Sequence, residues 1–480
     1  MSSTMDESQW TPLSSIDTIY TTLHQTWKSR LTLSLSFRRH QLLQLARMIQ
    51  DNTTAFEDAV LSDLGKQRQE CASTELGPIV HGALHAAAHL EEWASPEKPE
   101  VEAWRKNWDA TVYPVPKGVV LIISPWNYPI VLLLLPLIGA LSAGCPVLLK
   151  PSELTPHVSS LLSALLPSYL SPLAYALVTG GIPQTTALLA HRWAHIMYTG
   201  SGRVGRIVAA AAAKHVTPIT LELGGKSPVI VAEDADLELA ARRILFGKVQ
   251  NSGQLCVTPD YVLIPRHLAF AFHTALRKAH SSFFPLPPLA PSSPWSKIVN
   301  DAQYARLTGL LHNTKGTVIV GGECDEETRR IAPTVVGSVG ADDVLMDDEL
   351  FGPILPIVEV EDVDEAIEVV ASRPSPLVVY VFSNDKDVKQ KCLERTSSGS
   401  LVFNDTVWQI LVHEMPFGGI GESGYGSYFS KNTFDIFTHR RSFCNIPAEL
   451  EPFIGARYLP YTTDSYDTMS ANVRLPIPEN

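Results

Sequence analysis

The sequence is poor in charge, and the charge that it has is mostly acidic. Charged residues make up 18% of the 480 positions, and 50 acidic residues against 38 basic ones give a net charge of −12. A protein that binds nucleic acid through its phosphates needs the opposite sign, so we expect no nucleic-acid partner. Hydrophobic residues make up 45% of the chain, enough for a large folded core, which excludes a wholly disordered protein.

Cysteine is scarce and scattered. The six cysteines, none of them in a C-x-x-C pair, are Cys71, Cys145, Cys256, Cys324, Cys392 and Cys444. This pattern fits neither a zinc ribbon nor a disulfide framework, so we expect free thiols, a reducing compartment and no metal site. The N-terminus (MSSTMDESQW) lacks the basic and apolar segments of a secretory signal, which favours a cytoplasmic protein.

Residues 119–149 carry no charged side chain and are numerous enough to cross a bilayer at ~1.5 Å per residue. Prolines interrupt this run at positions 125, 129, 136 and 146. Because proline lacks a backbone donor and clashes with the preceding helical turn, a continuous span is the weaker alternative. We predict a buried strand, a core helix and a second strand, at 118–123, 130–143 and 146–150.

Short apolar runs alternate with helical patterns from residue 118 onward. The first series predicts further strands at 174–179 and 195–199 and helices at 157–166, 184–190 and 203–215. A second series predicts strands at 228–232, 261–264, 317–320 and 377–382 and helices at 236–248, 268–280, 300–312 and 363–371. Such alternation is typical of βαβ units, so we predict an α/β fold with two doubly wound lobes.

Two segments do not follow this alternation, one within it and one before it. Five prolines in residues 283–296 (FFPLPPLAPSSPWS) predict a stiff, exposed connector without regular structure. Residues 104–118 alternate in polarity before a proline-rich end, which could form a hairpin arm suited to dimerisation.

Cys256 is the cysteine best placed to act as a nucleophile. It follows the polar segment 251–255 (NSGQL), in which Gly253 permits a tight backbone. A reachable thiol in polar surroundings can ionise and attack an electrophilic carbon. The alternative, a small buried side chain that only fills space, is the commoner role of a lone cysteine.

Glu222 ends an apolar strand pattern (TPITLE) and precedes the pair Gly224 and Gly225. Functional groups of α/β sheets lie at such strand ends. A carboxyl group among apolar neighbours has a raised pKa and can serve as a general base near neutral pH. The alternative is an ordinary ion pair with Lys226.

Residues 200–205 (GSGRVG) match the G-x-G-x-x-G pattern between a predicted strand and a predicted helix. Backbone N–H groups at such a helix start bind pyrophosphate, so this context favours a dinucleotide site. The usual spacing would make Glu222 the ribose-binding acid. That role conflicts with its role as a general base.

Seven motifs occur in a set order along the chain: PWNYP at 125–129, KPSE at 150–153, GSGRVG at 200–205, ELGGK at 222–226, GQLC at 253–256, ELFGP at 349–353 and PFGG at 416–419. This set resembles the signature of the NAD(P)-dependent aldehyde dehydrogenases, over about residues 20 to 460. Further segments are most similar to the class 3, fatty-aldehyde branch: LGK at 64–66, AAAKH at 211–215, CVTPDY at 256–261, ERTSSG at 394–399 and FDIFTHRR at 434–441.

The resemblance implies an aldehyde dehydrogenase-like fold: two doubly wound α/β lobes, one for the cofactor and one catalytic, plus a small β oligomerisation arm. It places a dinucleotide-binding domain at 1–104 and 119–221, a catalytic domain at 222–434, and the arm and C-terminal tail at 105–118 and 435–480. It also implies a homodimer. Residues 449–480 are polar and contain no apolar run of ~18 residues, so we expect no membrane anchor of the kind common in this branch.

The resemblance also assigns catalytic roles. Cys256 attacks a small-molecule aldehyde, the Asn127 amide and the Cys256 backbone N–H stabilise the oxyanion, and Glu222 activates water to hydrolyse the thioester. The implied cofactor is NAD or NADP, a choice that the sequence leaves open. Lys150 and Glu153 would hold the adenosine ribose, which frees Glu222 for catalysis, and Glu349 would hold the nicotinamide ribose beside Phe351. The other implied cofactor-binding residues are Gly200, Ser201, Gly202, Arg203, Val204, Gly205 and Leu223.

Residues 407–415 (VWQILVHEM) are mostly apolar and precede the PFGG motif. Their apolar character suggests that they line a tunnel for medium- or long-chain aliphatic, or aromatic, aldehydes. An equally good alternative is that these side chains pack in the hydrophobic core. Two other functions stay open. An acylating dehydrogenase would pass the acyl group to coenzyme A, although such enzymes usually lack a glutamate at the position of Glu222. A cofactor-binding protein without turnover would not need the intact set Asn127, Glu222 and Cys256.

Overall fold

The computed structural model describes residues 10–479. Residues 1–9, in the segment predicted to lack a secretory signal, lie outside the described residues, as does residue 480. The chain folds into two compact units. The first contains the described residues up to Trp93 together with Pro116–Thr438, and the second contains Ala94–Val115 and the described residues from His439 onward.

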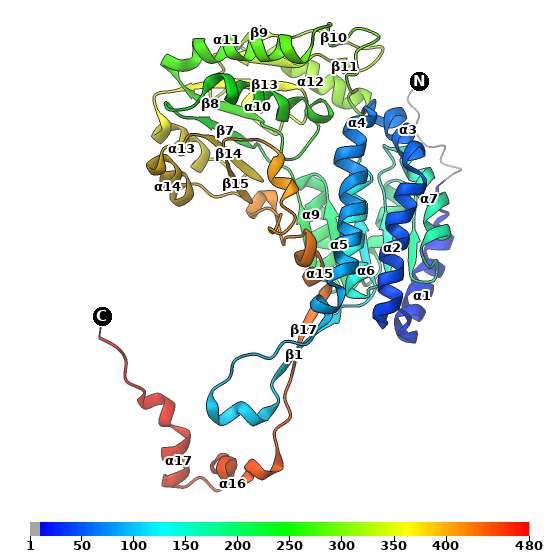
Figure 1. The fold of residues 1–480 in the computed structure, drawn as a ribbon, viewed down its shortest axis with the longest axis vertical. Helices are drawn as coiled ribbons and strands as arrows, with labels where there is room; N and C mark the ends of the chain where they lie inside the picture. Colours follow the sequence, from blue (N-terminus) through cyan, green and yellow to red (C-terminus); the bar gives the residue numbers. More distant parts are fainter. Residues whose placement is uncertain (1–9, 480) are drawn as a thin grey trace. The chain divides into compact units, whose positions relative to one another are not determined.

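A six-stranded sheet forms one lobe of the first unit, drawn mostly in blue and cyan in Figure 1. Its strands follow the order β16-β6-β5-β2-β3-β4. Its strands are β2 (Val120–Ile123), β3 (Val147–Lys150), β4 (Tyr175–Leu177), β5 (His195–Thr199), β6 (Ile219–Glu222) and β16 (Gly424–Tyr425). Neighbours are parallel except β16, which runs antiparallel to β6. Strands β2, β3 and β5 are buried along their length, which explains why β2 is apolar throughout and why the central residues of β3 and β5 are apolar.

Helices connect the strands of this lobe as predicted: α6 (Val131–Ala143), α7 (Pro156–Tyr169), α8 (Ile182–Leu189) and α9 (Gly202–Ala213). The N-terminal region adds α1 (Leu13–Ser29), α2 (Leu35–Asp51), α3 (Thr53–Leu64), α4 (Arg68–Cys71) and α5 (Gly77–Ala94). The uncharged run is thus a strand, a 13-residue helix and a second strand, as the prolines indicated. Across residues 10–479, no helix has both the length and the apolar character needed to cross a membrane.

The second lobe of this unit is built on a seven-stranded sheet in the order β15-β14-β7-β8-β13-β12-β9. Its strands are β7 (Pro228–Val231), β8 (Tyr261–Pro265), β9 (Thr317–Val320), β12 (Thr334–Gly337), β13 (Ile354–Val360), β14 (Val378–Phe382) and β15 (Ser400–Phe403). Its helices include α10 (Leu237–Val249), α11 (Arg266–Phe283), α12 (Asp301–Asn313), α13 (Val363–Ala371) and α14 (Lys386–Arg395). The two predicted α/β lobes are therefore confirmed, although the sequence analysis missed β12, β13, β15 and α14.

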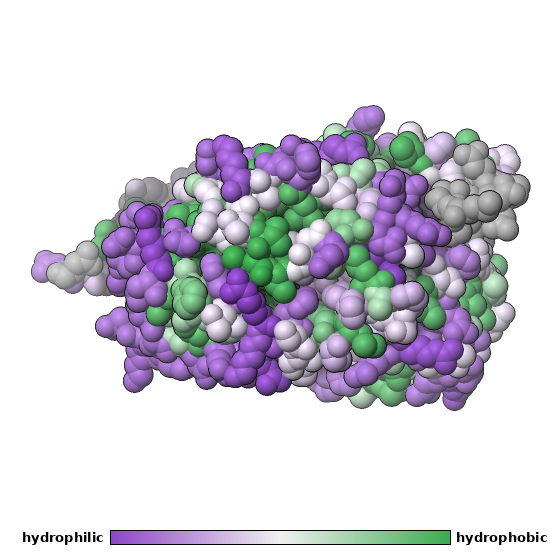
Figure 2. Space-filling model, turned by 90° about the horizontal axis from the view of Figure 1, so that it is seen from above, coloured by the Kyte–Doolittle hydropathy of each residue, from purple (hydrophilic) through white to green (hydrophobic). Residues whose placement is uncertain are grey.

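Several smaller elements complete the first unit. A two-stranded sheet joins β10 (Cys324–Asp325) to β11 (Arg330–Ile331), and helix α15 (Ser430–Phe437) precedes the second unit. In the proline-rich segment, Phe283 ends α11 and residues 284–296 contain no helix or strand, as predicted. The segment is not exposed throughout, because Trp295 and Ser296 are buried and the Trp295 indole donates to the Ile331 carbonyl. The face seen from above the second lobe carries a central group of hydrophobic residues bordered by hydrophilic ones (Figure 2).

The second unit contains a two-stranded sheet of β1 (Thr111–Pro116) and β17 (Thr438–Phe443). The prediction of a local hairpin at 104–118 is wrong, because Ala103–Trp108 forms a 3₁₀ helix and β1 pairs with a strand from the far end of the chain. A hairpin needs a turn between two adjacent strand-forming runs, and this segment supplies one such run. Short helices α16 (Glu451–Ile454) and α17 (Thr463–Met469) follow β17.

Candidate active site

A cleft of about 640 Å³ opens at the carboxyl ends of strands in the six-stranded sheet. Ile123, Lys150, Thr199 and Glu222, the last residues of β2, β3, β5 and β6, all line it. Ligands of α/β proteins bind at this edge of a sheet. The cleft is also lined by these residues singled out in the sequence: Asn127, Glu153, Gly200, Ser201, Arg203, Val204, Leu223, Cys256, Glu349 and Phe351.

Two predicted site residues, Gly202 and Gly205, are not among the residues that line the cleft. Both belong to the first turns of α9. A Cβ at Gly205 would lie 2.8 Å from Cδ2 of Leu223, closer than side chains tolerate. Gly205 therefore lets α9 pack tightly against the strand end, which is a supporting role.

Cys256 reaches the cleft through an unusual backbone. The preceding residues Asn251, Ser252 and Gly253 have φ values of 47°, 53° and 72°, and such left-handed runs in non-glycine residues cluster at functional sites. A Cβ at Gly253 would lie 2.2 Å from the Gly352 carbonyl oxygen, so glycine is needed there. All six cysteines are described and unpaired, and Cys256 is the one that lines the cleft.

The Cys256 thiol has a raised pKa. Burial is the main cause, the nearby carboxyl groups of Glu349 and Glu222 add to it, and together they bring the pKa to about 12. The backbone N–H groups of Cys256 and Val257 act in the opposite direction, because they stabilise the thiolate. The thiol therefore needs a base or a change in its surroundings before it becomes a nucleophile.

Glu222 lies at the end of β6 with 3% of its surface exposed, and neither carboxyl oxygen has a hydrogen-bond partner among the described residues. Burial raises the pKa of Glu222 well above its ordinary value. The alternative of an ion pair with Lys226 is wrong. Lys226 instead donates to Asp260 at 2.7 Å and to the Leu345 carbonyl, because the chain has already turned toward β7 at this point. Glu222 is thus free to bind water.

Asn127 lies in the loop between β2 and α6 and is also buried. Its Nδ2 donates one hydrogen bond to the Gln254 carbonyl at 3.1 Å. An amide nitrogen carries two hydrogens, so one donor is left for a ligand. The Gln254 carbonyl belongs to the loop that carries Cys256, which ties the amide to that loop.

The segment 200–205 forms the predicted strand–turn–helix, with β5 ending at Thr199 and α9 beginning at Gly202. Ser201 caps α9, and its Oγ accepts the Val204 N–H. At the end of β3, Lys150 Nζ donates to the Pro151 carbonyl and lies 3.7 Å from Oε2 of Glu153. The pKa of Lys150 lies below its ordinary value, because burial lowers it by more than the Glu153 carboxylate raises it.

Glu349 lies on the other side of the cleft, in the loop before β13. Its Oε1 is buried and has no hydrogen-bond partner among the described residues. Burial, with a contribution from Asp260, raises its pKa to about 8. A Cβ at Gly224 would lie 2.1 Å from Oε2 of Glu349, so glycine at this position makes room for the carboxyl group. The Phe351 ring packs edge-on against the Trp126 ring, and the two ring centres are 5.5 Å apart.

The cleft also contains residues that the sequence analysis did not assign. Gln303 and Arg306 come from α12, and the Arg306 guanidinium donates to Gln303 and to the Leu350 carbonyl. Isolated polar residues on a helix carry no motif, so the sequence offered no signal for them. Phe417 also lines the cleft, and its place in the PFGG motif was a signal.

None of the residues 407–415, predicted to form a substrate tunnel, lines this cleft, so the tunnel stays a prediction. The start of the segment nevertheless lies near Cys256, because the Val407 N–H and Gln409 Nε2 donate to the Tyr380 hydroxyl, which donates to the Val257 carbonyl. His413 and Glu414 instead line a separate cavity of about 30 Å³. The alternative of core packing fails for most of the segment, because Trp408, Leu411, Val412 and Met415 are exposed.

Comparisons with known proteins agree with the fold and the motifs. The model of the aldehyde dehydrogenase family matches residues 16–443. The chain is 42% identical to the dimeric NADP-preferring aldehyde dehydrogenase of Rattus norvegicus, over 93% of this chain and 98% of that one. It is 42% identical to aldehyde dehydrogenase family 3 member A2 of Mus musculus, over 87% of this chain and 86% of that one.

Among solved structures, the substrate-bound AldH of Staphylococcus aureus superposes with a TM-score of 0.92 at 36% identity, covering 96% of this chain and 99% of that one. These matches confirm the resemblance seen in the motifs, the class 3 branch included. The chain therefore belongs to the aldehyde dehydrogenase family and is an NAD(P)-dependent oxidoreductase that converts an aldehyde to its carboxylic acid.

Proposed function

We propose that this enzyme oxidises medium- or long-chain aliphatic, or aromatic, aldehydes, with Cys256 as the nucleophile, Asn127 as the oxyanion donor and Glu222 as the base for hydrolysis. The observation that carries the proposal is that these residues, from three separate segments, line one cleft. The apolar substrate class is supported by other lining residues, which include Leu132, Leu377, Phe417 and Tyr428.

In the first step, the Cys256 thiolate adds to the carbonyl carbon and the carbonyl oxygen becomes an oxyanion. Glu222 is close enough to raise the pKa of this thiol and can accept its proton. The free N–H of the Asn127 amide and the Cys256 backbone N–H donate to the oxyanion. Loss of one such donor typically raises the barrier by ~2.7–4 kcal/mol.

Bound NAD(P)⁺ supplies the acceptor for the hydride that leaves the carbon of this adduct. An acyl thioester then remains on Cys256. Glu222 first passes the proton taken from Cys256 to solvent and then removes a proton from water. The resulting hydroxide attacks the thioester, the carboxylic acid is released, and Glu222 returns the proton to the Cys256 sulfur. A buried carboxyl group with a raised pKa suits this step, because it is a stronger base than an exposed one.

The residues at the sheet edge fit a dinucleotide. Ser201 and the first N–H groups of α9 would hold the pyrophosphate, since a helix start favours anions. Lys150 and Glu153 would hold the adenosine ribose, and the unpartnered oxygen of Glu349 would accept hydrogen bonds from the nicotinamide ribose. We therefore propose the six-stranded lobe as the dinucleotide-binding domain and the seven-stranded lobe as the catalytic domain.

We also propose a cytoplasmic homodimer. The relative in Rattus norvegicus is named as dimeric, and the second unit exposes large hydrophobic side chains that a partner could cover, among them Phe453, Leu459, Val473 and Ile477. The six free cysteines support a reducing location. In this proposal, the β1–β17 arm and the tail contact the second subunit.

A substrate panel with NAD⁺ and without coenzyme A tests the proposed function. We expect steady NADH production and a kcat/KM that rises at least ~10-fold from acetaldehyde to decanal, because each buried CH₂ contributes ~0.8 kcal/mol. Benzaldehyde should also be a good substrate. NADH production that stops unless coenzyme A is added would favour an acylating dehydrogenase instead, and a preference for acetaldehyde would contradict the apolar substrate class.

The raised pKa values of Cys256 and Glu222 predict activity that increases with pH. Below its pKa of about 12 the thiol is mostly protonated, and the thiolate fraction grows ~10-fold per pH unit. The Glu222 carboxyl also gains its basic form as pH rises. We expect kcat/KM for an aldehyde, measured at saturating NAD⁺, to rise continuously from about pH 6.5 to about pH 9.5. A maximum at or below pH 7 would contradict this.

A further inference from the structure

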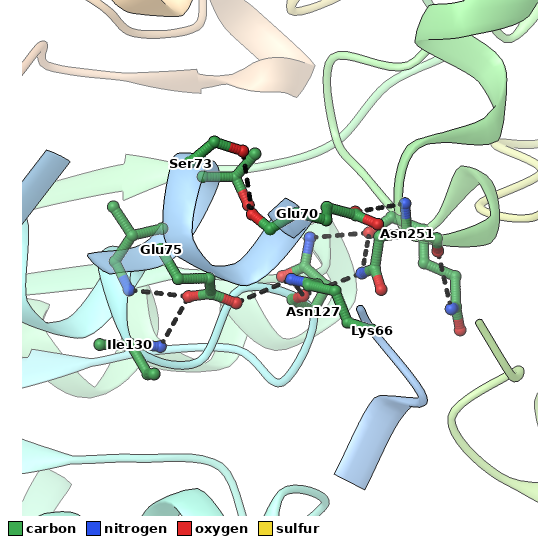
Figure 3. A network of polar contacts seen from close by, with 10 residues as sticks. Lys66, Glu70, Ser73, Glu75, Asn127, Ile130 and Asn251 are labelled. Atoms are coloured by element: carbon green, nitrogen blue, oxygen red, sulfur yellow. Dashed lines mark hydrogen bonds and ion pairs between the residues drawn. The ribbon is translucent and has the colours of Figure 1, made fainter. Parts of the chain in front are cut away.

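A buried ion pair lies behind the cleft, outside the residues that line it. Lys66 Nζ is 2.7 Å from Oε1 of Glu75, and both side chains are fully buried (Figure 3). Removing two charges from water costs several kcal/mol per ion, so such a pair is weak evidence for stability. Its hydrogen bonds suggest a different reason for its presence.

The pair holds the loop that carries Asn127 at two points. Lys66 Nζ donates to the Asn127 backbone carbonyl at 3.2 Å and lies 3.6 Å from the centre of the Tyr128 ring. The second oxygen of Glu75 accepts the N–H groups of Ile130 and Val131, each at 3.0 Å, where α6 begins. The backbone from 127 to 131 is therefore fixed from behind by one cation and one carboxylate.

A second carboxylate holds the loop that leads to Cys256. Glu70 Oε1 accepts the Asn251 N–H at 2.8 Å. The Asn251 side chain in turn donates to the Asn127 carbonyl at 2.8 Å and to the Gln254 carbonyl at 3.2 Å. That Gln254 carbonyl also accepts the Asn127 side-chain amide. The oxyanion donor and the nucleophile loop thus share one hydrogen-bond network (Figure 3).

A π-helical turn explains how Glu70 and Glu75 contribute to the same network. In an α-helix, with ~3.6 residues per turn, side chains five positions apart point in different directions. Residues Ala72–Leu76 form a π-helix, closed by the Gly77 N–H and the Ala72 carbonyl. The wider turn brings Glu70 and Glu75 to the same side. Single π turns of this kind occur frequently at functional sites.

We propose that Lys66, Glu70 and Glu75 are positioning residues that hold the Asn127 amide against Cys256 for oxyanion stabilisation. The inference rests on the proposed role of Asn127. It assigns a task to the LGK segment at 64–66, which the proposed mechanism leaves without one. Because these residues act through Asn127, their replacement should change the reaction rate little in an enzyme that already lacks the Asn127 amide.

A double-mutant cycle tests the proposal. We expect Lys66→Met to slow NADH formation in the first turnover by up to ~100-fold, the typical penalty for misplacing a catalytic group by 1 Å. In an Asn127→Ala background, Lys66→Met should slow first-turnover NADH formation less than about threefold, because the effects of substitutions that remove the same interaction are not additive. The Kd for NAD⁺ should change less than about twofold in both backgrounds. First-turnover rates come from stopped-flow absorbance, and the Kd from fluorescence titration.

Arg38→Met is the matched control. Arg38 is also a buried cation that donates to backbone carbonyls, those of Thr32 and Ser142, and neither it nor these partners line the cleft. It should lower the melting temperature without slowing the first turnover of folded enzyme. If Lys66→Met fails to fold, Glu75→Gln, which removes one charge at the same side-chain size, replaces it in the cycle.

Three outcomes would overturn the proposal. A first-turnover rate that Lys66→Met leaves unchanged would show that the ion pair does not act through Asn127, and so would equal slowing in both backgrounds. If Asn127→Ala itself has no effect, the proposed role of Asn127 fails, and the positioning role fails with it. A strong effect of Asn127→Ala beside a neutral Lys66→Met would leave the proposed function intact and refute the positioning role alone.

Discussion

Replacing Cys256 by serine should abolish aldehyde oxidation and leave NAD⁺ binding nearly unchanged. A serine hydroxyl ionises far less readily than a thiol, and nothing in the cleft offers it a base as strong as it would need. Loss of a nucleophile that forms a covalent intermediate typically costs ~10⁴-fold or more in kcat. Cofactor affinity should be kept, because Lys150, Glu153 and Ser201 belong to other segments of the cleft wall.

The Cys256→Ser experiment combines steady-state NADH production with calorimetry of NAD⁺ binding. Cys324→Ser is the matched control, since Cys324 is exposed and does not line the cleft. This variant should retain full turnover. Turnover of Cys256→Ser close to that of the parent enzyme would refute the assignment of the nucleophile.

Glu222→Gln should allow one hydride transfer and then stall. Glutamine has the same shape as glutamate but cannot accept a proton, so water is no longer activated and the thioester persists. We expect a burst of about one NADH per site, followed by a steady rate ~10²- to 10⁴-fold below that of the parent, the usual contribution of a general base. The loss of a negative charge beside Cys256 should also lower the pKa of its thiol.

Mass spectrometry of the stalled Glu222→Gln enzyme should find an acyl group on Cys256. Glu233→Gln is the control, because Glu233 is an exposed carboxylate that follows β7 and does not line the cleft. It should turn over normally without a burst. Steady turnover of Glu222→Gln near the parent rate would remove Glu222 from deacylation. A variant that gives neither a burst nor turnover would show that ionisation of the Cys256 thiol also requires Glu222 as the base.

Local sequence patterns determined the parts of the fold that short segments can specify. The GSGRVG segment forms its strand–turn–helix because capping by Ser201 and the glycine positions act within a few residues. Strands β2 and β3 are recognisable because strands covered on both faces are mostly apolar, and β2 is apolar throughout while β3 is apolar up to its last residue, Lys150. The prolines of the uncharged run likewise separated a folded core from a membrane span.

The assignment of site residues depended on motif order more than on physical pattern. Cys256 and Glu222 each had an ordinary alternative, and the order of seven motifs favoured the catalytic one. The residues then converge on one cleft in the structure. Gln303 and Arg306 could not be found in this way, since a polar side chain on an amphipathic helix has no distinguishing neighbours in sequence.

The sequence by itself determined the α/β class, the uncharged core segment, the dinucleotide motif and the family to which the chain belongs. Tertiary structure alone decided that Lys226 pairs with Asp260 and not with Glu222, and that β1 pairs with β17. It also decided that Lys66 pairs with Glu75 and donates to the Asn127 carbonyl. The physical reason is that helix and strand patterns arise from neighbours along the chain, whereas the partner of a charge or a strand edge is whichever group the completed fold brings beside it.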